Sequence, residues 1–327
     1  MNLTLRLIRN WADERAIPDL IVAELDYRLT YALAAIYRDP FLAGRLCLKG
    51  GTVLNKLYFP ALSRLSVDLD FNAVGLKAQV LAERSQIISR LETLFAAQNA
   101  DYTVTHDYRY EQTNIVAQYT PLSGGSRQRL KLEISTVERV PILGRTARNL
   151  ILPDGSSAPI ATYYLEELTA TKLRALYARR KGRDIYDLWR ITGLDLNERA
   201  VRKLTLYYFY HAKMVFHHPT FLANVEEKLR HHGFADDVRG LIRVGQDFDW
   251  AEACGAVLER FAFLGEFEER DTRFLDFARM LLGKPVSGAA LATVADIEYP
   301  IAWLMEGVSI SEEAATLRQE DIRVFLA

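Results

Sequence analysis

Residues 64–73 of the chain read Arg-Leu-Ser-Val-Asp-Leu-Asp-Phe-Asn-Ala. Polar and apolar side chains alternate along this run, which is the pattern of a strand with one buried face. Residues i and i+2 of a strand point to the same side, so Asp68 and Asp70 are expected side by side, with the apolar residues on the buried face. This strand anchors the prediction of a sheet in the N-terminal half.

A glycine-rich turn precedes this strand. A short strand is expected at 45–49, and it runs into Gly50, Gly51 and Thr52 before a helix at about 53–59. Glycine allows close backbone approach, and the N-terminus of a helix offers free N–H groups to a phosphate. The turn is therefore a candidate phosphate site, although a tight turn in which Thr52 caps the helix would have the same sequence.

The paired carboxylates suggest a metal. Asp68 and Asp70 repel each other, and each raises the pKa of the other unless a cation lies between them. A Mg²⁺ ion with carboxylate and triphosphate oxygens as ligands meets that need. A solvated strand face with two acids is the alternative. Thr52 lies 16 residues before Asp68, so the turn and the strand can be neighbours in one sheet.

The rest of the pattern divides the chain in two. A long helix is expected at 77–97, and residues 141–161, rich in Gly, Pro and Asp, are expected to form loops or short extended pieces. Three more strands are expected near 102–110, 113–121 and 128–136, and helices follow almost without interruption from 163. The predicted fold class is α+β: a mixed sheet flanked by helices in a domain of residues 1–162, then an all-helical domain of residues 163–327.

Two further groups of charged residues are candidates for the site. Lys131 and Glu133 share one face of their strand, where Glu133 is either a third metal ligand or half of a Lys/Glu pair facing solvent. Lys172 lies on the apolar stripe of its helix and needs a partner. Asp184 and Asp187, one turn apart on the next helix, are its candidates. Such a pair could simply orient two helices.

Residues 168–183 are strongly basic and contain no acid. Such a cluster complements the dipole at the end of a helix, and it could also grip an RNA backbone. Its six basic side chains are Lys172, Arg174, Arg179, Arg180, Lys181 and Arg183.

Composition and charge exclude several classes of protein. The chain has 327 residues, half of them hydrophobic, and its 41 basic and 42 acidic residues give a net charge of −1. Global charge therefore gives no sign of nucleic-acid binding, which would have to come from local patches. No apolar run approaches the roughly 20 residues that span a bilayer, and no signal peptide is evident, so a cytoplasmic location away from membranes is expected. Cys47 and Cys254, far apart, suit a reducing compartment.

Three motifs in this order resemble the AbiEii/AbiGii toxin nucleotidyltransferases of the DNA polymerase β-like superfamily. The first is Leu-Lys-Gly-Gly-Thr at 48–52 together with the run ending at Asp70, and the second is Lys-Leu-Glu at 131–133. The third is Lys172-x-x-Ala followed by Arg-Asp-x-x-Asp at 183–187. The usual acid of the second motif is Asp, so Glu133 departs from the family pattern.

The resemblance implies a toxin of a type IV toxin–antitoxin or phage-defence pair. Such an enzyme transfers NMP from an NTP to an acceptor hydroxyl, here expected to be the 3′ end of tRNA, and has an antitoxin protein as its partner. The expected catalytic residues are Asp68, Asp70, Lys172 and Asp187, and the expected Mg²⁺ ligands are Asp68, Asp70 and Glu133. Expected contacts to the nucleotide come from Gly50, Gly51, Thr52, Ser66, Lys131, Glu133, Arg183 and Asp184.

Two other functions remain open. An enzyme of the same fold could use a hydroxyl of a small molecule or a protein as acceptor. A non-catalytic nucleotide- or RNA-binding regulator could carry a vestigial site. The joint presence of Asp68, Asp70, Lys172 and Asp187 argues against the regulator.

Overall fold

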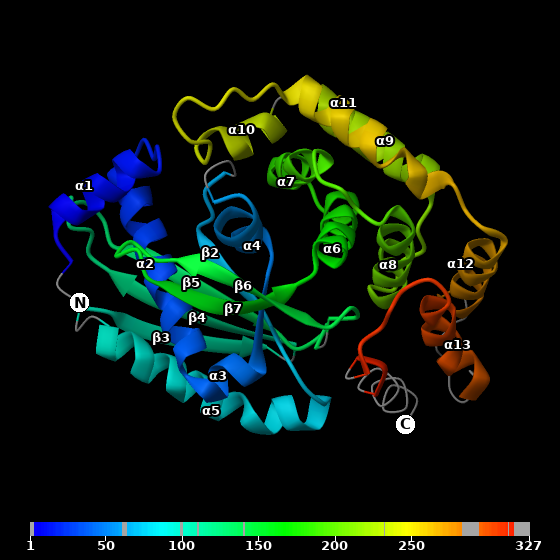
Figure 1. The fold of residues 1–327 in the computed structure, drawn as a ribbon, viewed down its shortest axis with the longest axis horizontal. Helices are drawn as coiled ribbons and strands as arrows, with labels where there is room; N and C mark the ends of the chain where they lie inside the picture. Colours follow the sequence, from blue (N-terminus) through cyan, green and yellow to red (C-terminus); the bar gives the residue numbers. More distant parts are fainter. Residues whose placement is uncertain are drawn as a thin grey trace. The chain divides into compact units, whose positions relative to one another are not determined.

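The computed structural model describes residues 3–60, 64–98, 101–109, 111–139, 141–231, 233–282, 294–312 and 314–316. The chain divides into two compact units (Figure 1). The first comprises Met1–Val140, Arg145–Tyr163 and Leu241–Asp247. The second comprises Pro141–Gly144, Tyr164–Gly240 and Phe248–Ala327.

The first unit contains a mixed sheet with the strand order β3-β4-β5-β2-β1-β7-β6. The β1–β7 and β2–β5 pairs are parallel, and the other neighbouring pairs are antiparallel. This confirms the predicted mixed sheet flanked by helices. In chain order the strands are β1 (Leu46–Lys49), β2 (Asp68–Ala73), β3 (Thr103–Arg109), β4 (Gln112–Tyr119), β5 (Gln128–Ser135), β6 (Arg145–Ile151) and β7 (Ser157–Tyr163).

One face of this sheet forms the core of the first unit. Leu69, Phe71 and Leu132 are fully buried on it. Helix α2 contacts β2, β5 and β7, and it also contacts α5. The side chain of Asp19 caps α2 by accepting from the N–H groups of Ile21 and Val22. The helices of this unit are α1 (Leu5–Glu14), α2 (Leu20–Arg38), α3 (Pro40–Arg45), the short α4 (Gly51–Val53), the π-helical turn η1 (Leu54–Tyr58) and α5 (Lys77–Gln98).

The expectation of loops or short extended pieces at 141–161 is correct for the extended pieces and wrong for the loops, because most of this range lies in the sheet. The chain there forms a hairpin of two seven-residue strands, β6 and β7, joined by a turn in which Gly155 adopts φ +78°. Pro159 makes β7 difficult to predict from the sequence, because proline has no N–H for a sheet ladder. In the structure Pro159 pairs in register with Asn149 of β6, and β7 is in register with β1 at the Leu48–Thr162 pair.

Residues 241–247 belong with the sheet, although they lie among helical segments of the sequence. The N–H of Leu65 donates to the Leu241 carbonyl at 2.8 Å, and the N–H of Val244 donates to the Ala16 carbonyl at 2.8 Å. The Arg243 guanidinium donates to the Arg15 carbonyl at 2.5 Å. These contacts between distant segments have no signature in local sequence periodicity.

The second unit is helical in its described residues, as predicted. Its helices are α6 (Leu165–Ala178), α7 (Gly182–Thr192), α8 (Glu198–His211), α9 (His218–Arg230), α10 (Gly233–Arg239), α11 (Trp250–Arg260), the 3₁₀ turn η2 (Ala262–Gly265), α12 (Glu269–Leu282) and α13 (Val294–Met305). Residues 232, 283–293, 313 and 317–327 of the predicted all-helical domain lie outside the described residues. In the part of the chain that the structure describes, no helix has the length and apolar character needed to cross a membrane.

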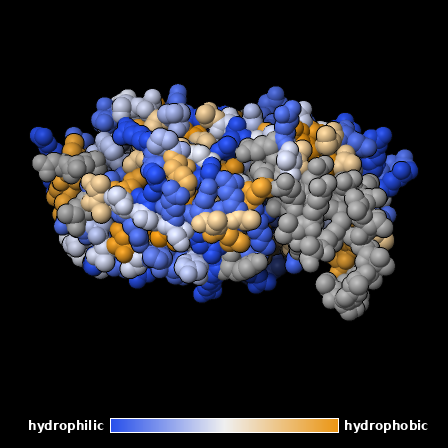
Figure 2. Space-filling model, turned by 90° about the horizontal axis from the view of Figure 1, so that it is seen from below, coloured by the Kyte–Doolittle hydropathy of each residue, from blue (hydrophilic) through white to orange (hydrophobic). Residues whose placement is uncertain are grey.

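Among the described residues, the large apolar side chains that are exposed are isolated from one another in the sequence. Tyr108, Val244 and Met305 are among the most exposed of them. On the coloured part of the face in Figure 2, hydrophilic and hydrophobic residues are interspersed. Isolated exposed apolar residues are ordinary for a folded protein.

Candidate functional site

Polar residues of β1, β2 and β5 gather on the sheet face opposite the core. Asp68 pairs in register with Lys131, and Asp70 pairs with Glu133. Lys49 pairs with Asp70 from the other side. Directly paired residues of neighbouring strands point to the same face, so five charged side chains share one surface. We call this surface the acidic face; its charged residues are Lys49, Asp68, Asp70, Lys131 and Glu133. All five are half-buried, so they remain accessible from solvent in the first unit.

This face places an ammonium among carboxylates. Lys131 forms an ion pair with Glu133. The hydrogen bond to Glu133, followed by the charges of Glu133, Asp68 and Asp70, raises the pKa of Lys131 above its ordinary value, and partial burial opposes this only in part. The three carboxylates therefore act together on the Lys131 ammonium, and their combined negative charge favours a cation at that position.

The carboxylate of Glu133 is occupied by neutral and positive donors. Besides Lys131, it accepts a hydrogen bond of 3.0 Å from Gln112, which also donates to Asn114 at 2.9 Å. Among the described residues, no three His, Cys, Asp or Glu side chains converge as a metal site. Asp68 and Asp70 alone still fit Mg²⁺, which in nucleotide enzymes takes one or two carboxylates and completes its shell with water and phosphate oxygens.

The glycine turn packs directly against Asp70. Gly50 adopts φ +80°, a conformation that L side chains rarely take, and a β-carbon there would overlap the Asp70 carboxylate. Glycine at this position therefore serves both the backbone conformation and the close approach. Gly51 begins α4, which continues as the π-helical turn η1 where the sequence predicts an ordinary helix at 53–59. Single π-helical turns of this kind often occur at functional sites.

Thr52 and Ser66 hold β2 in place. Their hydroxyl oxygens are 2.6 Å apart, and the Thr52 hydroxyl also donates to the Asp68 carbonyl at 2.5 Å. Both residues are buried. Gly50, not Thr52, occupies the N-cap position of α4, and no side chain caps that helix. The structure thus gives Thr52 and Ser66 a positioning role for Asp68, and contact with phosphate stays a prediction.

The second unit contains the other predicted catalytic residues. The ammonium of Lys172 on α6 lies 2.7 Å from Asp187 and 3.7 Å from Asp184, both on α7. All three side chains are buried. Arg179 donates two hydrogen bonds of 2.7 Å to Asp184. The ion pair between helices that the sequence suggests is therefore present, and the binding of triphosphate by Lys172 stays a prediction.

The remaining predicted contact, Arg183, lies at the start of α7. The Arg183 guanidinium is 3.4 Å from the carboxylate of Asp237 on α10, and the backbone N–H of Arg183 donates to the same carboxylate at 3.3 Å. It therefore ties α7 to α10 within the second unit. Contact of Arg183 with nucleotide stays a prediction.

Sequence reasoning missed two side chains on the acidic face. Lys49, which lies opposite Asp70, also forms an ion pair of 3.7 Å with Glu138. The sequence does indicate the position of Lys49: it ends the run Leu-Cys-Leu-Lys, and the alternation of a strand places it on the polar face. Gln112 carried no such signal, because only the pairing of β4 with β5 brings it to Glu133.

A solved toxin structure shares this fold. The nucleotidyltransferase toxin MenT4 from Mycobacterium tuberculosis superposes with a TM-score of 0.63 at 21% identity, over 86% of this chain and 99% of that one. JHP933 from Helicobacter pylori gives a TM-score of 0.48 at 17% identity, over 78% and 94% of the two chains. No curated protein sequence matches the chain.

A match to a family sequence model shows which family this chain belongs to. The sequence model described as "Nucleotidyl transferase AbiEii toxin, Type IV TA system" matches residues 31–254, which is more than half of the chain. The matched range includes the acidic face of the sheet, the glycine turn and the Lys172 ion pair. The chain therefore belongs to the AbiEii family of nucleotidyltransferase toxins of type IV toxin–antitoxin systems.

Proposed function

We propose that this protein transfers a nucleoside monophosphate from an NTP to the 3′-terminal hydroxyl of tRNA, which blocks translation. The observation that supports it best is the acidic face of the sheet, where Asp68 and Asp70 lie beside the Gly50 turn and share their surface with Lys131. We expect the reaction to occur in the cytoplasm, where tRNA and NTPs are found. A cognate antitoxin protein is the expected partner.

In this proposal Asp68 and Asp70 hold Mg²⁺. When bound there, Mg²⁺ would neutralise charge on the triphosphate and on the departing pyrophosphate. Glu133 would join as a third ligand by exchanging its contacts with Lys131 and Gln112 for the metal. The carboxylate oxygens of all three residues are the donor type that this ion prefers.

The reaction itself is an in-line displacement. The acceptor hydroxyl gives up its proton to solvent and its oxygen forms a bond to the α-phosphorus, while the bond from that phosphorus to the bridging oxygen of the β-phosphate breaks and pyrophosphate leaves. Lys131, with its raised pKa, stays protonated at neutral pH and can offset phosphate charge. Positioning and charge stabilisation supply most of the catalysis in such sites. The catalytic roles of Lys172 and Asp187 remain predictions.

The direct test is incubation of the purified chain with Mg²⁺, total tRNA and each α-³²P-labelled NTP in turn. Label on tRNA with one preferred NTP would identify the reaction, the acceptor and the base together. Label on the protein itself would replace tRNA with a protein hydroxyl as acceptor. Tight NTP binding without pyrophosphate release would instead support the non-catalytic regulator.

Gly50→Ala is expected to reduce both stability and transfer. Alanine at φ +80° costs about 1–2 kcal/mol in backbone strain, and its β-carbon would displace the Asp70 carboxylate. Gly155→Ala is the matched control, because Gly155 has φ +78° and open space around its β-carbon position. Urea unfolding should show a similar loss in the free energy of unfolding from backbone strain in both variants. Transfer should fall only in Gly50→Ala, and equal activity of the two would show that the turn does not position Asp70.

A further inference from the structure

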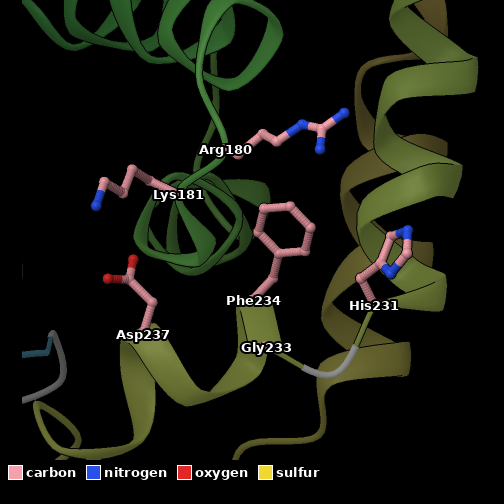
Figure 3. Close-up of a pocket in the computed structure, with 6 residues that line it drawn as sticks. All are labelled: Arg180, Lys181, His231, Gly233, Phe234 and Asp237. Atoms are coloured by element: carbon pink, nitrogen blue, oxygen red, sulfur yellow. The ribbon is translucent and has the colours of Figure 1, made fainter.

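The second unit carries a pocket of about 460 Å³ beside the turn that joins α6 to α7. In Figure 3 the ring of Phe234 lies in the middle of the view, with Arg180 and His231 on one side and Lys181 and Asp237 on the other. Gly233 completes the lining. A volume of this size is typical of ligand sites, which range from about 300 to 1,000 Å³.

Three of the six cations of the basic segment 168–183 are paired with carboxylates within the second unit. Lys172 pairs with Asp187, Arg179 pairs with Asp184, and Arg183 pairs with Asp237. These ion pairs join α6, α7 and α10 to one another. Of the other three cations, Arg174 lies over the ring of Tyr208, and Arg180 and Lys181 line the pocket.

The two cations that line the pocket are available to a ligand. Lys181 is exposed, and the Arg180 side chain is 75% exposed. Arg180 forms a 2.9 Å ion pair with Glu227, whose side chain is 43% exposed. Exposed pairs of this kind contribute at most about 1 kcal/mol, so a phosphate can replace Glu227 at little cost. The charge of Asp237 is shared with Arg183.

The wall of the pocket is fixed by close packing. Gly182 begins α7, and a β-carbon there would overlap the carbonyl group of Phe234 on α10. The backbone of α10 therefore rests directly on the first residue of α7, immediately after Arg180 and Lys181. The N–H of Phe234 also donates to the His231 carbonyl at 3.1 Å. The backbone that carries Phe234 is thus held against the residue that directly follows the two cations.

We propose that this pocket is a subsite for the acceptor RNA, which takes one phosphodiester and the adjoining unpaired base. Arg180 and Lys181 would contact the phosphate, and the base would stack on the half-buried ring of Phe234 at the rim formed by His231. Cations beside an aromatic platform are the combination by which proteins hold single-stranded nucleic acid. The proposal rests on the proposed function in one respect, that RNA is the acceptor.

The test measures RNA binding by the full chain, without NTP or Mg²⁺. Fluorescence anisotropy of a short labelled single-stranded RNA is followed over a range of salt concentrations. Arg180→Ala/Lys181→Ala should weaken binding about tenfold and lower the salt slope by about 0.7 for each phosphate that the variant no longer neutralises. Phe234→Leu should weaken binding about fivefold or more, with the slope unchanged, because it removes stacking but not charge.

The matched control is Arg273→Ala/Arg279→Ala, which also removes two cations of the second unit. Both side chains lie on α12, are 70% and 51% exposed, and are absent from the pocket lining. This control should bind RNA like the wild type. Equal weakening in the control and the pocket variant would show a diffuse charge effect and would overturn the subsite. Wild-type protein that does not bind the RNA would overturn it as well.

Two comparisons separate this proposal from the proposed function. Pocket-dependent RNA binding without label transfer to tRNA would keep the subsite and reject tRNA as the acceptor. Transfer to tRNA that is unchanged in the pocket variants, with unchanged binding, would keep the function and reject the subsite. Displacement of the RNA by an equal concentration of AMP would make the pocket a mononucleotide site and would reject the proposal.

Discussion

Asp70→Asn is expected to lower nucleotide transfer by a factor on the order of 10³ or more while the fold stays intact. Asparagine keeps the shape of the side chain against the Gly50 turn, but it removes one of the two charges proposed to hold Mg²⁺. Loss of that charge relieves repulsion with Asp68 but also removes attraction to Lys49 and Lys131, so the stability should change little. Transfer of label to tRNA and thermal unfolding are the two measurements.

The control is Asp107→Asn, which removes an exposed carboxylate from β3 of the same sheet. It should transfer label like the wild type. A second readout is independent of the acceptor: Mg²⁺ with a non-hydrolysable NTP analogue should raise the melting temperature of the wild type and of Asp107→Asn. The same addition should leave Asp70→Asn unchanged. An Asp70→Asn variant that transfers normally would remove Asp70 from the site.

The parts of the fold that follow local periodicity were predictable. The strand at Asp68–Ala73 and the helix at Lys77–Gln98 each bury one face of a regular pattern, so the sequence carries their period. The hairpin of β6 and β7 was not predictable in this way. Its pattern is interrupted by Pro159, a residue type that is rare inside strands because it lacks the N–H of the ladder.

The candidate site was predictable for a similar reason. The two acids Asp68 and Asp70 are two residues apart on one strand, so their common orientation follows from strand geometry alone. The approach of Gly50 to Asp70 and the hydrogen bond from Gln112 to Glu133 depend on strand pairing between distant segments. Pairing of that kind is set by the whole sheet, which one sequence does not specify locally.

The buried pair of Lys172 and Asp187 can be assigned by separating stability from activity. Lys172→Met or Asp187→Asn alone should lower the free energy of unfolding by about 3–5 kcal/mol, because each removes one charge of a buried pair and leaves the other. The double variant removes both charges and should recover much of this loss. Urea unfolding at neutral pH gives these free energies.

A second buried pair serves as the control for this cycle. Lys56 lies 2.8 Å from Asp26 in the first unit, and both side chains are almost fully buried. No catalytic role is predicted for either residue. Lys56→Met/Asp26→Asn should therefore behave like the other double variant in unfolding, and it should keep its transfer activity wherever it is folded.

Transfer by the double variant Lys172→Met/Asp187→Asn then decides between the two roles that sequence leaves open. A pair that only orients α6 and α7 has no function beyond stability, so activity should return as stability returns. A pair that acts on the triphosphate cannot be restored by removing both charges, and we expect transfer to stay at least about 100-fold below the wild type in a folded protein. Recovery of both properties together would reduce Lys172 and Asp187 to a structural ion pair, and the catalytic charge would then have to come from elsewhere, with Lys131 and Lys49 on the acidic face as the first candidates.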